Sequence, residues 1–117
     1  MEARCTANTA VQALVATPLN MKCIIDSIFI NNRSGVAIRV QLEDDFQQDI
    51  SVNNAGVVAR SAFPFDQSVP ATSTFNADVN SLQARYGEQG LTAIGNLGAI
   101  CDSIQATCDI LIYFHFE

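Results

Sequence analysis

Alternation of apolar and polar residues is the strongest signal in this chain. Over residues 36–42, valine, isoleucine, valine and leucine occupy every second position, with alanine, arginine and glutamine between them. A period of two is the pattern of a β-strand with one buried face. The preceding run, residues 24–30, is rich in β-branched and aromatic side chains, and the Asn-Asn-Arg-Ser-Gly segment that follows it has turn chemistry. These features predict a β-hairpin over residues 24–42.

Residues 108–117 form a second alternating segment. One predicted face is apolar and is expected to join the core; it holds Ile110, Ile112, Phe114 and Phe116. The opposite face carries Leu111, Tyr113 and His115 between acidic ends. A strand that is apolar on both faces near its middle is often covered on both sides. We therefore expect another part of the chain, or another subunit, to cover Leu111 and Tyr113.

Shorter elements are predicted elsewhere. Strands are expected at residues 10–15, 57–63 and 91–97, and Pro64 is expected to end the second of them. A short helix is also expected, because three apolar residues recur with the spacing of one helix face: Val79, Leu82 and Tyr86. Asp78 or Asn80 can cap its start and Gly87 can end it.

Short strands with turn signals between them favour an all-β fold, an antiparallel β-sandwich or jelly roll with at most one short helix. The absence of strands alternating with long amphipathic helices argues against a doubly wound α/β fold. An α+β fold, with one helix packed on a sheet, is the alternative.

Composition and charge narrow the function. The chain has 117 residues, of which 49% are hydrophobic and 15% charged, and this composition suits β-structure and broad contact surfaces. The net charge is −6 and the six cationic side chains are scattered, so binding to nucleic acid or to an anionic membrane is disfavoured. We expect a single domain over residues 1–117, in which residues 1–20 either belong to the sandwich or form an N-terminal arm on a neighbouring subunit.

The chain offers few groups for catalysis or metal binding. His115 is its one histidine, so a nucleophilic serine or cysteine would depend on it as base, and a small enzyme using His115 is one alternative. The cysteines lack the close spacing of metal ligands and are expected to be reduced; they are Cys5, Cys23, Cys101 and Cys108. The acidic segment 43–49 lacks the pattern of a calcium loop. We expect no catalytic residue, metal or cofactor.

Two aromatic residues flank Pro64, and such a triplet forms a rigid apolar projection. Either one ring is buried at a strand end, or the pair anchors the protein in a partner's pocket. The residues expected to contact another subunit or partner are Phe63, Phe65, Leu111, Tyr113 and His115.

The chain resembles the head decoration, or cement, proteins of tailed bacteriophages. The resemblance rests on the segment 24–42 with its Asn-Asn-Arg-Ser-Gly turn, on the strand 108–117, and on the charge-poor composition rich in Ser, Thr, Asn and Gln. It implies a structural virion protein, assembled in the host cytoplasm, that forms a homotrimer and stabilises the head by bridging major capsid proteins. It implies no catalytic residues. A carbohydrate- or receptor-binding β-sandwich of a tail or fibre, with Tyr86 or Tyr113 in an exposed groove, is the alternative.

Overall fold

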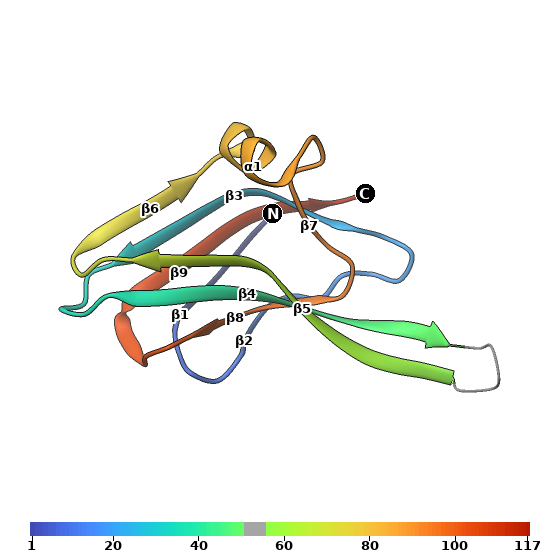
Figure 1. The fold of residues 1–117 in the computed structure, drawn as a ribbon, viewed down its shortest axis with the longest axis horizontal. Helices are drawn as coiled ribbons and strands as arrows, with labels where there is room; N and C mark the ends of the chain where they lie inside the picture. Colours follow the sequence, from blue (N-terminus) through green and yellow to red (C-terminus); the bar gives the residue numbers. More distant parts are fainter. Residues whose placement is uncertain (51–55) are drawn as a thin grey trace.

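Two antiparallel sheets face each other in this protein (Figure 1). The structure is a computed structural model that describes residues 1–50 and 56–117, with side chains except those of residues 46–50 and 56–63. Sheet A has the strand order β1-β9-β3-β6, and the short β7 also pairs with β3; sheet B has the order β2-β8-β4-β5. The elements are β1 (Glu2–Ala7), β2 (Gln12–Val15), β3 (Cys23–Asn32), β4 (Ile38–Ile50), β5 (Gly56–Val69), β6 (Ser73–Ala77), α1 (Val79–Tyr86), β7 (Leu91–Ala93), β8 (Asn96–Cys101) and β9 (Gln105–Phe116).

Without the short β7, this strand order is that of a jelly roll, whose eight strands form two four-stranded sheets; β7 is an additional strand on β3. The chain passes from one sheet to the other at most connections, and within sheet B only β4 and β5 follow each other directly. The predicted all-β class is therefore confirmed, with α1 as the one helix among the described residues.

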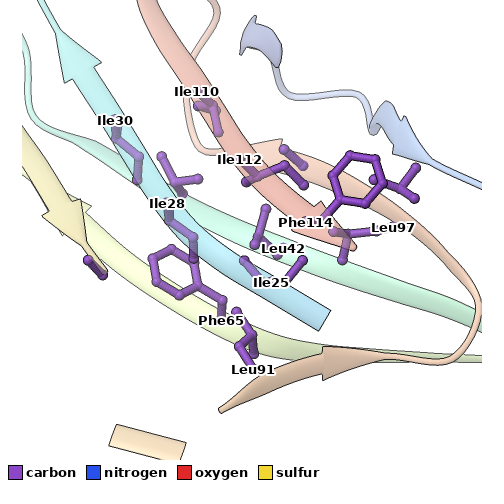
Figure 2. Close-up of a cluster of buried hydrophobic side chains, with 14 of the residues drawn as sticks. Ile25, Ile28, Ile30, Leu42, Phe65, Leu91, Leu97, Ile110, Ile112 and Phe114 are labelled. Carbon is purple, nitrogen blue, oxygen red and sulfur yellow. The ribbon is translucent and has the colours of Figure 1, made fainter. Parts of the chain in front are cut away.

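The core lies between the two sheets. The predicted inward face of β9 is confirmed, because Ile110 and Ile112 are fully buried and Phe114 is 7% exposed. Sheet B contributes the inward residues of β4, which are also fully buried. Figure 2 shows side chains of both sheets meeting in this core: Ile25, Ile28, Ile30, Leu42, Phe65, Leu91, Leu97, Ile110, Ile112 and Phe114.

The two segments predicted as a hairpin are strands, but they do not pair with each other. β3 pairs with β6, β7 and β9, whereas β4 pairs with β5 and β8. The intervening turn instead carries the chain from sheet A to sheet B, and the fully buried Asn32 holds it there. The Asn32 amide donates to three backbone carbonyl oxygens, those of Val36, Val69 and Pro70. Turn chemistry reverses the chain locally but does not choose the partner strand, so the hairpin prediction was wrong.

β5 continues through Pro64 instead of ending there. Within the described chain this strand pairs with β4 alone, so it forms an edge of sheet B. Proline has no N–H to donate, and a strand tolerates it at an edge or a bulge, where no neighbour needs that hydrogen bond. A register shift between Leu42 and Asp44 places such a bulge at this position.

Residues 91–97 hold two strands, not the single one predicted, since β7 belongs to sheet A and β8 to sheet B. Asp44 fixes the turn between them: its carboxylate accepts hydrogen bonds from the backbone N–H of Ile94 (3.0 Å) and of Gly95 (2.8 Å). One carboxylate of the predicted acidic segment therefore has a structural role. The side chain of Asp49, in the same segment, lies outside the described residues.

The predicted helix is confirmed as α1. Asp78 is its N-cap and accepts a hydrogen bond from the backbone N–H of Ser81 at 2.8 Å, and Gly87 ends it with φ of 96°. Residues 1–20 contribute both β1 and β2, of which only β2 was predicted; each forms an edge of one of the chain's own sheets.

Candidate functional site

The surface of sheet A that points away from sheet B, here called the outer face, exposes an aromatic and aliphatic centre. Ile110, Ile112 and Phe114 point into the core, so the two residues that alternate with them point outward. These residues are Leu111 and Tyr113, and Tyr113 is 43% exposed. His115 follows on the same face of β9 and is half-buried. The structure thus places three of the predicted contact residues side by side along one strand.

Phe29 completes this centre, although sequence reasoning did not select it. It lies on β3 directly opposite Leu111, and Ser27 lies opposite Tyr113. The alternation of β3 is interrupted, since its buried residues Ile25 and Ile28 are three positions apart. The interruption is a β-bulge at Asp26, where the register with β9 shifts. A bulge of one residue shifts the alternation, so the residues after it lie on the opposite face from the one that a strict period of two predicts. The period-two pattern therefore did not identify Phe29.

Polar residues surround the apolar centre. Arg4, Asn31 and Asp109 line a shallow hollow of about 170 Å³ together with Phe29 and Leu111. Asp109 accepts a hydrogen bond from the Arg33 guanidinium at 2.8 Å, and Arg4 forms an exposed ion pair with Glu2 at the same distance. An apolar centre within a polar rim is the usual arrangement of a surface that binds another protein.

His115 belongs to a cluster of charged groups at one end of β3 and β9. The bulge brings Asp26 to this histidine, with Nδ1 lying 2.9 and 3.0 Å from the two Asp26 carboxylate oxygens. Nε2 lies 3.3 Å from a Glu117 carboxylate oxygen. These hydrogen bonds, that to Asp26 first, raise the pKa of His115 above its usual value.

The His115 cluster lines a cleft of about 350 Å³ between α1 and the ends of β3 and β9. Because the neighbouring carboxylates favour the imidazolium, the ring holds a proton more tightly than free histidine does. A carboxylate on Nδ1 also orients a histidine that acts as a general base. The residues that line this cleft, however, include no serine, threonine or cysteine that the ring could activate. The contacts described here form an electrostatic link between the two strands.

Phe65 is a core residue and is not available to a partner, contrary to expectation. Its side chain is 1% exposed, and its ring centroid lies 5.9 Å from that of Phe75. The Arg85 guanidinium lies over the Phe65 ring, 5.3 Å from its centroid. Phe65 is the cross-strand partner of the buried Leu42, so the two side chains share the inward face of sheet B. The side chain of Phe63, the other predicted anchor, lies outside the described residues.

Tyr86 also packs against the core, with its ring beside Arg85. Its hydroxyl is buried and has no hydrogen-bond partner among the described residues. Of the two tyrosines considered for an exposed groove, only Tyr113 is therefore presented to solvent to any large extent.

The four thiols are free of disulfides. Burial raises the pKa of Cys5 to about 12 and that of Cys23 and of Cys108 to about 11, so these thiols stay protonated at neutral pH and react slowly. Among the described residues, no group of three or more histidine, cysteine or acidic side chains is arranged to hold a metal ion. The one helix in the described part of the chain is too short to cross a membrane.

The paired strands β4 and β5 extend past the rest of the sandwich as a two-stranded ribbon (Figure 1). β4 pairs with β8 only as far as Asp45, opposite Asn96. Beyond that point residues 46–50 pair with residues 56–60, and we call these two stretches the arm. The molecule measures 52 × 29 × 22 Å along its principal axes, which makes it distinctly elongated. A lone two-stranded ribbon is at best marginally stable in water, so a contact outside the described chain would stabilise the arm.

Comparison with known proteins identified no relative. A scan against models of protein families, a search of curated proteins and a search of solved structures each found no match. A jelly roll by itself is compatible with many functions, so any function must be inferred from the sites on this chain.

Proposed function

We propose that this protein is a structural component of a virus particle, a decoration protein that binds the outside of a bacteriophage head and bridges neighbouring major capsid proteins. The observation that carries the proposal is the arm. Residues 46–50 and 56–60 pair only with each other in the described chain, beyond the last pairing of β4 with β8. Such a ribbon gains stability when it lies against another protein, and it can reach a neighbour while the sandwich stays rigid.

Two further features support an assembly role. The outer face offers an exposed apolar centre, which a second subunit would cover. The charge of −6 with few cationic groups keeps the free protein soluble without attracting nucleic acid. The resemblance to phage decoration proteins implies three copies, and several weak contacts on a repeating shell add up through avidity.

Shell binding tests the proposal directly. The purified protein would be mixed with expanded capsid shells of a tailed bacteriophage and sedimented. We expect saturable co-sedimentation, and shells that resist heat or a chelator better than bare shells do. If the protein neither binds the shells nor protects them, the proposal is wrong.

An armless variant makes the test specific. Asp45 and Ser61 are cross-strand partners, so an Asn-Gly turn in place of residues 46–60 closes the shortened hairpin in register. We expect this variant to fold and to lose shell binding. Ile104→Ser is the surface control, because Ile104 is 65% exposed on the connection between β8 and β9 and should not matter. Equal binding by the armless variant would contradict the role of the arm.

A carbohydrate-binding module is the second candidate, favoured by one observation. Tyr113 is exposed near a hollow lined by Arg4, Asn31 and Asp109, side chains that can hydrogen-bond to sugar hydroxyls. A glycan array followed by NMR titration would test it. Binding that Tyr113→Ala abolishes would support this candidate, and a blank array would count against it.

A further inference from the structure

We propose that the outer face of sheet A pairs with the same face of a second copy of this chain, about a two-fold axis that runs parallel to the strands between β9 and β3. The proposal does not depend on capsid binding, and it departs from the three copies that the resemblance implies: it requires two copies, or six if a three-fold contact lies elsewhere on the chain. It follows from the cross-strand register of described residues, which makes the outer face complementary to itself.

The central pair shows the complementarity. Leu111 and Phe29 are cross-strand partners on β9 and β3. A two-fold axis between these strands exchanges the two positions, so Leu111 faces Phe29 of the second copy and Phe29 faces Leu111 of the second copy. The ring of Phe29 is then brought to the partner's hollow of about 170 Å³, which Leu111 lines. Two half-buried apolar side chains are thus covered in each copy.

The neighbouring positions match in size and in hydrogen bonding. Tyr113, the most exposed aromatic residue of this face, meets the small Ser27 of the second copy, because these two are also cross-strand partners. Asp109 meets Asn31 of the second copy in the same way, which places carboxylate oxygens opposite an amide donor. A large side chain faces a small one, and an acceptor faces a donor.

The outer strands also fit. The same axis lays β1 over β6 of the second copy. Arg4 pairs with Leu111 and Asn76 with Phe29, so the Arg4 guanidinium meets the amide of Asn76 of the second copy. Like charges, which would disfavour self-pairing, are brought together only at the edge of the face. There the row of Tyr113 and Ser27 places Glu2 near Asp78 of the second copy, and the Glu2 carboxylate is already paired with Arg4.

The face is close in size to a small interface. With strands about 4.8 Å apart and roughly 3.3 Å of rise for each residue, the strands of sheet A at their own lengths cover roughly 550 Å² in flat projection. The accessible surface of protruding side chains exceeds this projection. A stable interface buries about 800 Å² on each partner, so this face approaches the required area. Two sheets packed face to face with nearly aligned strands are also a common arrangement.

The first test is the mass in solution, measured by light scattering after size exclusion over a range of protein concentrations. We expect twice the chain mass of 12.6 kDa, or another even multiple if copies also associate elsewhere. Leu111→Arg should halve that mass, because the longer side chain clashes with the opposed Phe29 ring and its charge would be withdrawn from water without a carboxylate partner at the centre of the interface. Ile104→Arg, a matched change at an exposed aliphatic residue outside this face, should leave the mass unchanged.

A reciprocal exchange tests the geometry itself. Ser27→Tyr alone opposes two tyrosines across the axis and should weaken association at least tenfold. Ser27→Tyr combined with Tyr113→Ser restores one large and one small residue at each contact, and it should recover most of the lost affinity. Circular dichroism and thermal unfolding would establish that each variant is folded.

Three results would overturn the proposal. The first is a monomer at every concentration, and the second is an odd number of chains such as a trimer. The third is an even-numbered assembly that Leu111→Arg does not change, which would place the contact on another surface. Shell binding by a monomeric chain would leave the decoration role intact while refuting the pairing, so the two proposals can fail separately.

Discussion

Replacing Phe65 by alanine tests whether this residue belongs to the core or anchors an interface. Phe65 is 1% exposed between the sheets and packs against the Phe75 ring and beneath the Arg85 guanidinium. Truncating a buried phenylalanine to alanine removes its transfer free energy and leaves a cavity, at a cost of about 3–5 kcal/mol. The aromatic and cation–π contacts place Phe65→Ala in the upper part of that range.

Such a loss is a large part of the stability of a small domain, which is about 5–15 kcal/mol. For a domain of this size it corresponds to a fall in the midpoint of thermal unfolding of roughly 12–20 °C. Urea unfolding measures the change directly, and an unchanged denaturant slope would show that the cost arises in the native state.

Phe29→Ala is the matched control, because it removes the same atoms from the partly exposed outer face. Both variants would be made in the Leu111→Arg background, so that self-association does not contribute. We expect Phe29→Ala to cost about 1 kcal/mol, since the ring is only partly withdrawn from water. Our assignment of Phe65 to the core would be refuted if Phe65→Ala cost less than the control, or if it reduced shell binding without reducing stability.

Three further predictions concern other features of the fold. Asn32→Ala should destabilise the protein by about 2–4 kcal/mol in urea unfolding, because the buried amide donates to three carbonyl oxygens that would lose their partner. Gly98→Ala should cost about 1–3 kcal/mol, since an added Cβ would lie 2.6 Å from Val11 Cγ1; a variant of native stability would show that this close approach relaxes freely. The pKa of His115 is raised in the folded state, so its contribution to stability is complete below the unfolded value near 6.5 and is lost as pH rises through the folded value. The difference in thermal midpoint between the native protein and His115→Gln should therefore be larger in mild acid than in alkali, and Asp26→Asn should lower the pKa of His115 measured by NMR.

Local signals predicted several elements correctly. The inward residues of β9 and of β4 follow from strict alternation, and α1 follows from its apolar spacing and its caps. Val36 was wrongly included in the buried face, since it precedes β4 and is 46% exposed. These features depend on neighbours within a few residues. The errors occurred where a distant partner decided the outcome, as at Pro64, which is tolerated because β5 lies at an edge, and at residues 91–97, which divide between two sheets.

The candidate site was predictable only in part. Leu111, Tyr113 and His115 could be assigned to one face because β9 alternates without interruption beyond Cys108. Phe29 could not, because the bulge at Asp26 changes the face of every residue after it. The aromatic residues around Pro64 allow either a buried ring or an exposed anchor, and only the burial of Phe65 shows that it belongs to the core.

The sequence by itself determined the all-β class, the low charge and which residues of the best strands face inward, since period and composition act through local geometry and solvation. Only the tertiary structure decided which strands are neighbours, because pairing depends on contacts between residues far apart in the chain. Asn32 is the clearest case: a local reading makes it a turn residue, whereas in the fold it bonds to carbonyl groups more than thirty residues away and joins the two sheets. The outer face and the arm arise in the same way, as surfaces that exist only once the sheets have assembled.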